Sequence, residues 1–213
     1  MKRSNLFIAF EGIDGSGKST QLRLLADRLR REGHRVYCTS EPTDSPIGSV
    51  IRNVFKHRIE ADHRTIAALF AADRIDHLVN RTDGILAKLD EGFTVLCDRY
   101  YFSSYAYQGI HMPVDWVIEI NAPAVNMLRP DLHIYIDLEP AESMRRVHNG
   151  RSSTELYETT ENLRAVRQQY LDCLNRFRPN ESWCLLSGAD SPEEVAKAVW
   201  VMVAPLLVER EGS

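Results

Sequence analysis

The residues most able to do chemistry lie in one glycine-rich segment, Gly12-Ile13-Asp14-Gly15-Ser16-Gly17-Lys18-Ser19, which Thr20 follows. The segment matches the pattern G-x-x-x-x-G-K-[ST], in which glycines let backbone N–H groups converge on phosphate oxygens. We expect Lys18 to reach the β- and γ-phosphates of a nucleoside triphosphate, and the Ser19 hydroxyl to ligate Mg²⁺. The alternative is a glycine-rich turn that fits the pattern by chance. The pattern favours binding of ATP or GTP and leaves the acceptor of a phosphoryl group open.

A second pair of charged residues, Asp98 and Arg99, directly follows the apolar run 93–97. At the end of a buried strand, the Asp98 carboxylate would face the glycine-rich segment and hold the water shell of the metal. The planar fork of Arg99 suits a phosphate dianion, which it binds through two charge-assisted hydrogen bonds. An ion pair between these two neighbours in a turn is the structural alternative.

Short apolar runs that alternate with helical patterns must position these groups. Strands are expected over residues 6–10, 35–39, 93–97, 132–136 and 182–186, and helices over 19–31, 47–55, 65–79, 155–177 and 192–208. The first run lacks polar alternation, as expected for a strand buried on both faces. Five strands separated by helices predict an α/β fold of the P-loop NTPase type, with a parallel sheet covered on both faces. Ligands then bind beyond the carboxyl ends of the strands.

The length of 213 residues predicts one domain over residues 1–213, and the net charge predicts no broad attraction to nucleic acid or membrane. The chain is 44% hydrophobic and 26% charged, with a formal net charge of −4, so a sizeable core can form and basic residues must act locally. The four cysteines lack Cys-x-x-Cys spacing, and Cys38 and Cys97 are expected to be buried thiols. With neither a signal peptide nor a membrane-spanning run in the sequence, a cytoplasmic protein is expected.

Several segments resemble the thymidylate kinases, in the same order and over nearly the whole chain. They are residues 10–20, Glu41-Pro42, Phe70-Ala71-Ala72-Asp73-Arg74, Asp98-Arg99-Tyr100, Ser103-Ser104-Tyr105-Ala106-Tyr107-Gln108-Gly109 and Arg129-Pro130-Asp131-Leu132. The resemblance implies a nucleoside monophosphate kinase that transfers a phosphoryl group from ATP to dTMP with Mg²⁺, giving dTDP for dTTP synthesis. It also implies a homodimer.

The resemblance further implies roles for residues that would bind the acceptor. Phe70 would stack on the thymine ring, and Arg74, one helical turn later, would donate to a thymine carbonyl. By composition alone, Phe70 on an alanine-rich helix would be a core residue. Arg99 and Arg52 would clamp the acceptor phosphate.

Other roles follow from the same resemblance. Ser104 and Gln108 would help to line the base site, and Tyr107 would fill the space that a ribose 2′-hydroxyl needs. Asp14 would lie between the two phosphates and bind the 3′-hydroxyl, or order the metal and Arg99.

A basic lid is expected over about residues 145–158, because kinases of this kind close arginines over ATP. Gly15 stands where one type of thymidylate kinase has arginine in the P-loop, so the lid must supply that charge. Arg151 is the first candidate, followed by Arg145 and then Arg146, and for each a solvated helix charge is the alternative.

Two further features of the lid are expected. A turn is predicted at Asn149-Gly150, and Glu158 would contact either the water shell of the metal or an arginine.

Two other classes of protein remain as alternatives. A kinase for another deoxynucleoside monophosphate, or for a nucleoside, would share the glycine-rich segment, although a nucleoside has no phosphate for Arg99 to bind. A non-catalytic P-loop module or switch would bind nucleotide without transfer. The sequence has no Asn-Lys-x-Asp motif for guanine, which weighs against a GTP switch.

Overall fold

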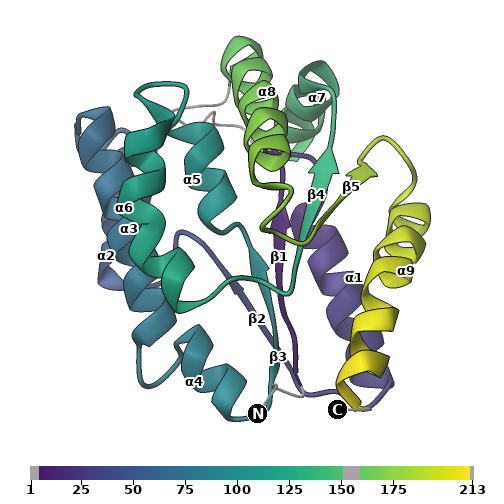
Figure 1. Ribbon diagram of the computed structural model, residues 1–213. Coiled ribbons are helices and arrows are strands. Elements are labelled where there is room, and N and C mark those ends of the chain that lie inside the picture. The colour runs from purple at the N-terminus through teal and green to yellow at the C-terminus, as the bar shows by residue number, and fades with distance from the viewer. Residues whose placement is uncertain (1–4, 151–158, 212–213) are drawn as a thin grey trace.

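The computed structural model describes residues 5–150 and 159–211 and has a five-stranded, fully parallel sheet at its centre (Figure 1). The spatial order of the strands is β2-β3-β1-β4-β5. Their bounds are Phe7–Glu11 for β1, Val36–Ser40 for β2, Thr94–Asp98 for β3, Leu132–Asp137 for β4 and Trp183–Ser187 for β5. The predicted α/β class and the five parallel strands are confirmed.

Helices cover both faces of the sheet, because the central strand β1 sends alternate side chains into two separate cores. Phe7 and Ala9 belong to one core, whereas Ile8 and Phe10 belong to the other. The second core is closed by α1 (Lys18–Arg31) and α9 (Pro192–Glu211). The first core is closed by α3 (His63–Val79), α4 (Ile85–Asp90), α5 (Tyr101–Tyr107), α6 (Val114–Met127) and α8 (Thr160–Phe177). This two-sided burial explains the continuous apolar run of β1.

Four helices were not predicted from the sequence: α4, α5, α6 and α7 (Pro140–Gly150). All seven residues of α5 are buried, so this helix has no polar face and gives no amphipathic signal. Helix α6 contains Pro123 in its interior, a residue that normally argues against a helix. The remaining predicted helix, α2, is present over Pro46–Phe55.

Two local predictions are wrong. The turn expected at Asn149-Gly150 does not form, because α7 continues to Gly150. Cys38 is exposed rather than buried, since it lies on β2, at the edge of the sheet, whereas Cys97 on β3 is buried as expected. In the described part of the chain, α8 begins at Thr160 after its N-cap Thr159, and the predicted start at 155 lies outside that part.

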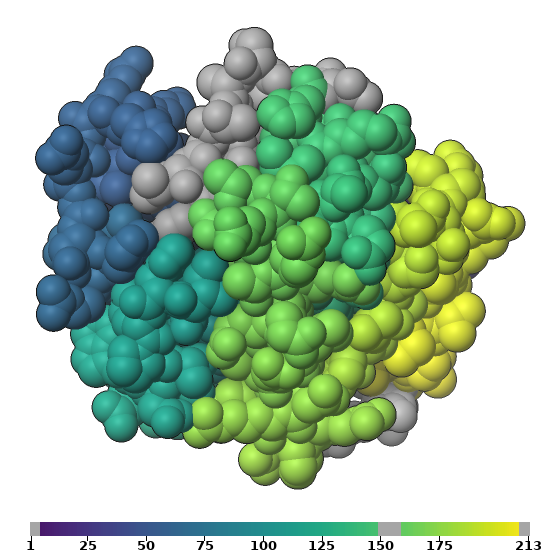
Figure 2. Space-filling model, turned by 90° about the horizontal axis from the view of Figure 1, so that it is seen from above, coloured from purple at the N-terminus to yellow at the C-terminus, as the bar shows by residue number. Residues whose placement is uncertain are grey.

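The carboxyl ends of the strands meet at one edge of the sheet, as parallel pairing requires. Phe10 on β1 is paired with Asp98 on β3, which is also paired with Ser40 on β2. Figure 2 shows the molecule from above, with α8 between the blue α2–α3 side and the yellow α9. No helix among the described residues is both long and apolar enough to cross a membrane. The site therefore has to be sought where the strands end.

We predict a pH-dependent stability from Glu11, the last residue of β1, whose burial raises the pKa of its carboxyl from 4.5 to about 7. Between these values the folded protein keeps a proton that the unfolded chain releases, so stability falls as the pH rises through this window. Glu11→Gln does not titrate. The free energy of unfolding of the wild type minus that of the variant should therefore decrease from pH 4.5 to 7 and then level off. The free energies of unfolding are measured by urea titration at several pH values. A difference between wild type and variant that does not change with pH would contradict the raised pKa of Glu11.

Candidate active site

The glycine-rich segment forms a loop between β1 and α1 whose shape requires glycine. Gly12 and Gly15 have φ angles of +141° and +72°, a region that side chains disfavour. A Cβ atom on Gly12 would lie 2.5 Å from the carbonyl oxygen of Ile136, and one on Gly15 would lie 2.8 Å from that of Ser143. The loop is thus packed between β4 and α7 and opens at the N-terminus of α1. A helix N-terminus of this kind attracts phosphate.

The ammonium group of Lys18 is buried within this loop. Its side chain is buried, and its Nζ donates to the carbonyl oxygen of Ile13 at 3.0 Å. Burial, followed by the charge of Arg99, lowers the pKa of the Lys18 ammonium to about 8. The nearby Ser16 Oγ is buried without a hydrogen-bond partner among the described residues. An anion bound in the loop would satisfy both groups.

Ser19 and Asp98 offer oxygen atoms suited to Mg²⁺. The Ser19 hydroxyl donates a short hydrogen bond to Asp98 Oδ2. Asp98 Oδ1 is buried and accepts no hydrogen bond within the described part of the chain. Hydroxyl, carboxylate and water oxygens are the ligands that Mg²⁺ prefers. The residues therefore fit the metal predicted at this position.

Arg99 is paired with Asp14 rather than with its neighbour Asp98. Arg99 adopts φ +76°, and its Nη2 lies 2.5 Å from Asp14 Oδ1. Burial alone would raise the pKa of the Asp14 carboxyl, but the charges of Arg99 and Lys18 lower it to about 2. The turn pair considered as an alternative is thus not the observed geometry. Arg99 and Asp14 lie side by side at the mouth of the phosphate loop.

Two cavities meet at this pair. One, of about 690 Å³, runs along the phosphate loop and the start of α1. The other, of about 430 Å³, is lined by all seven residues predicted to bind the acceptor: Arg52, Phe70, Arg74, Arg99, Ser104, Tyr107 and Gln108. Asp14 and Arg99 line both cavities. The arrangement can hold two phosphorylated ligands with their phosphates facing each other.

The second cavity has an aromatic wall and a tyrosine floor. Phe70 is half-buried and packs its edge on Phe55, with the ring centroids 5.9 Å apart, so it is not one of the buried core residues. The Tyr107 hydroxyl donates to Asp14 Oδ2 at 2.9 Å. Gln108 Oε1 is buried without a partner in the described residues. These groups can contact a flat base and a sugar.

Comparison with known proteins decides between the classes of kinase. A sequence model of thymidylate kinases matches residues 10–199. This chain belongs to the thymidylate kinase family. It is 44% identical to a probable thymidylate kinase of Caldivirga maquilingensis over 169 residues, which cover 78% of this chain and 79% of that protein. It is also 39% identical to a probable thymidylate kinase of Thermococcus onnurineus, over 96% of this chain and all of that protein. The family consists of nucleoside monophosphate kinases, so this chain is a phosphotransferase.

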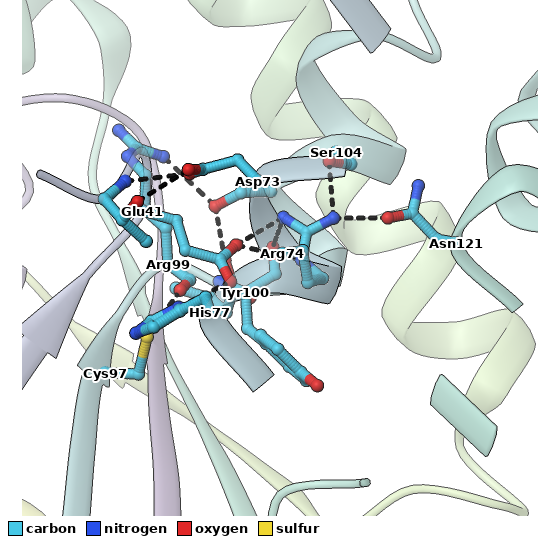
Figure 3. Close-up of polar contacts among 12 residues, drawn as sticks. Glu41, Asp73, Arg74, His77, Cys97, Arg99, Tyr100, Ser104 and Asn121 are labelled. Atoms are coloured by element: carbon cyan, nitrogen blue, oxygen red, sulfur yellow. Dashed lines mark hydrogen bonds and ion pairs between the residues drawn. The ribbon is translucent and has the colours of Figure 1, made fainter. Parts of the chain in front are cut away.

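Arg74 in this family member is fully engaged by protein groups, as Figure 3 shows. Its side chain is 1% exposed and donates to Glu41 Oε2 at 2.6 and 2.9 Å. Further donors reach Ser104 Oγ at 3.0 Å, Asn121 Oδ1 in a short bond and the Tyr100 carbonyl at 3.2 Å. These bonds occupy all five N–H groups of a guanidinium. Donation to a thymine carbonyl would thus require one of these bonds to be given up.

No role was predicted for the loop after β2 beyond the Glu41-Pro42 motif, yet this loop lines the smaller cavity. Asp73 is buried and accepts from the backbone N–H of Thr43 at 2.8 Å and from the Ser45 hydroxyl at 3.0 Å. Arg52 donates to the carbonyl oxygens of Pro42 and Thr43. Asn121, which was missed, lies on a helix without a sequence signal. Glu41 and Asp73 entered the sequence analysis only as members of segments that resemble the thymidylate kinases, and no role was predicted for either residue.

The residues predicted to act in the lid differ in whether the structure describes them and in what they contact. Arg151 and Glu158 lie outside the described residues. Arg145 is 65% exposed and pairs with Glu142 at 2.7 Å, as a solvated helix charge would. Arg146 pairs with Glu142 at 2.8 Å, donates to the carbonyl oxygen of Gly188 at 3.0 Å and lines the larger cavity. An arginine at position 15 would require the backbone of Ser143 to shift, because a Cβ atom there would lie 2.8 Å from its carbonyl oxygen.

Proposed function

We propose that this chain transfers the γ-phosphoryl group of ATP to dTMP, giving ADP and dTDP. The observation that carries the proposal is the meeting of the two cavities at Asp14 and Arg99, in a chain of the thymidylate kinase family. ATP would occupy the cavity along the phosphate loop, and dTMP the cavity beside Phe70. An oxygen of the dTMP phosphate attacks the γ-phosphorus while the bond from that phosphorus to the β,γ-bridging oxygen breaks.

The protein would act by positioning and by stabilising charge, as in other phosphoryl transfers. The backbone N–H groups of the loop and Lys18 would bind the β- and γ-phosphates. Arg99 and Arg52 would hold the acceptor phosphate in line with them. Because a phosphate oxygen is already nucleophilic, no side chain has to remove a proton from it.

Ser19 and Asp98 would hold Mg²⁺, the second directly or through water by its Oδ1, which accepts no hydrogen bond from the described residues. When bound, the metal neutralises negative charge on the β- and γ-phosphate oxygens. An arginine of the lid would supply further charge in the transition state, an effect worth about 10³- to 10⁵-fold in rate. Arg151 stays our first candidate for it, followed by Arg145. The place of Arg146 on the larger cavity suits binding of the donor nucleotide.

The base and sugar would be recognised in the smaller cavity. Phe70 would stack on thymine, with Arg74, Ser104 and Gln108 around its polar edge. Tyr107, hydrogen-bonded to Asp14, would fill the space of a 2′-hydroxyl, and Asp14 would accept from the 3′-hydroxyl.

A homodimer and a cytoplasmic location are also proposed. Large apolar side chains that are exposed include Val50 on α2, Val79 on α3 and Met127 on α6, with Ile59 between α2 and α3. Figure 1 places these three helices on the same side of the molecule. Exposed apolar side chains on this side of the molecule suit contact with a second copy of the chain. No nucleic-acid or membrane partner is proposed.

We predict that dTMP is the preferred acceptor and that dUMP is weaker, because the apolar wall formed by Phe70 and Phe55 should contact the thymine methyl. One methyl group in an apolar pocket is worth roughly 1 to 3 kcal/mol, so kcat/KM for dTMP should exceed that for dUMP about tenfold or more. ADP release is measured in a coupled assay across a panel of nucleoside monophosphates. A better rate with AMP or CMP would refute the base assignment and favour another monophosphate kinase. Nucleotide binding without acceptor-dependent turnover would instead favour a non-catalytic P-loop module.

A further inference from the structure

The guanidinium of Arg99 is held through both of its terminal nitrogens. Its Nη2 donates to Asp14. Its Nη1 lies 3.2 Å from the carbonyl oxygen of Gly12 in the phosphate loop, 3.2 Å from Ser103 Oγ and 3.5 Å from the Tyr170 hydroxyl oxygen. Tyr170 lies on α8, 71 residues further along the chain. No sequence motif pointed to this contact.

A buried carboxylate orients the two hydroxyls. Ser103 Oγ and the Tyr170 oxygen lie 2.6 and 3.1 Å from Glu11 Oε2, and 2.6 Å from each other. Above about pH 7, where the Glu11 carboxyl is ionised, it only accepts hydrogen bonds, so the hydroxyl protons are directed toward it or between the two hydroxyls. The oxygen lone pairs are then left to accept from Arg99. The other Glu11 oxygen accepts from the backbone N–H of Tyr100 at 3.0 Å, next to Arg99 in the chain.

An ion pair next to Tyr170 fixes the position of helix α8 relative to the end of β4. One turn before Tyr170, Arg167 forks onto both oxygens of Asp137 at the end of β4, at 2.7 and 2.8 Å. The Tyr170 ring is fully buried, with its centroid 5.1 Å from that of Tyr135. Packing of the ring needs no hydroxyl, and among the described residues the hydroxyl hydrogen-bonds Glu11, Ser103 and Arg99.

We infer that Tyr170 is a positioning residue for Arg99: its hydroxyl, together with Ser103 and oriented by Glu11, fixes the guanidinium in the place where it receives the acceptor phosphate. The inference rests on the proposed role of Arg99 as the phosphate clamp. A residue on α8 thereby determines the affinity for the acceptor, although it does not line the acceptor cavity.

Tyr170→Phe tests the inference, with Tyr101→Phe as the matched control. Tyr101 is also a buried tyrosine of the same core, and its hydroxyl bonds to His133 Nε2 at 3.0 Å, away from Arg99. Tyr170→Phe should weaken dTMP binding about two- to tenfold, the range for one hydrogen bond. ATP binding should stay within about twofold. Tyr101→Phe should change neither affinity. Calorimetric titrations and melting temperatures on both variants measure these effects. Equal losses of melting temperature with unchanged dTMP affinity in Tyr170→Phe would overturn the inference.

A double-mutant cycle with Arg99→Met separates the inference from the proposal beneath it. If Tyr170 acts through Arg99, adding Tyr170→Phe to Arg99→Met should not weaken dTMP binding further. If the second substitution weakens binding by the same factor as in the wild type, the phosphate clamp stands and the positioning role is refuted. If Arg99→Met alone leaves dTMP affinity unchanged, the clamp itself is wrong, and the inference falls with it.

Discussion

Lys18→Ala is expected to abolish phosphoryl transfer and to leave the fold intact. The ammonium lies within the phosphate loop, bonded only to the carbonyl of Ile13 among the described residues. It would stabilise charge that develops on the transferring phosphoryl group, and loss of one such group costs about 10² to 10³ in kcat or more. Its pKa is lowered to about 8, chiefly by burial. Burial of this charge therefore destabilises the folded protein when no nucleotide is bound. Removing the charge should not lower the melting temperature.

The measurement is dTMP-dependent ADP release by Lys18→Ala, with a melting curve of the same preparation. Lys88→Ala is the matched control, since Lys88 lies on α4 and pairs with Glu91 at 3.0 Å, outside both cavities. It should keep wild-type turnover. Near-normal activity in Lys18→Ala would refute the assignment of the donor site. Lost activity together with a collapsed melting curve would instead point to a structural role.

Arg99→Lys is expected to weaken dTMP binding by roughly 1.5 to 3 kcal/mol, or about 10- to 150-fold, because one hydrogen bond to a charged group is lost. Lysine keeps the charge but lacks the planar fork. The fork reaches Asp14 through one nitrogen and Gly12, Ser103 and Tyr170 through the other. The single ammonium of lysine cannot donate to Asp14 and to this second set of partners at the same time. The φ of +76° at this position disfavours arginine and lysine alike, so backbone strain does not bias the comparison.

The dTMP affinity, ATP affinity and melting temperature of Arg99→Lys together identify its role. A phosphate clamp predicts a loss confined to dTMP. A purely structural ion pair with Asp14 predicts a lower melting temperature and unchanged dTMP affinity, which would count against the proposal. Arg129→Lys is the control, because Arg129 pairs with Glu181 at 2.8 Å, away from the site, and should change neither affinity.

Local patterns in the sequence were sufficient for the phosphate loop and the sheet. The loop conformation depends on glycines at fixed spacing, and the steric reason for Gly12 and Gly15 is the close approach of backbone from β4 and α7. The five strands are continuous apolar runs because helices bury both of their faces. Because parallel strands end at one edge, the order of elements also predicted that Asp98 and Arg99 would face this loop. The resemblance to the family added six residues that line the smaller cavity, whereas Arg99 was already predicted from its place after a strand. The six are Arg52, Phe70, Arg74, Ser104, Tyr107 and Gln108.

Only the tertiary structure decided which partners hold those residues. Helices α5 and α6 gave no helical signal, the first because it is buried all round and the second because it contains Pro123. Asn121, which contacts Arg74, was therefore missed. Cys38 is exposed because β2 is an edge strand, and an apolar run does not reveal its place in the sheet. Glu11 and Tyr170 are 159 residues apart in the chain. Periodicity and motif spacing report on neighbours in sequence, whereas the hydrogen bonds that fix Arg99 join β1, α5 and α8, and only packing brings these elements together.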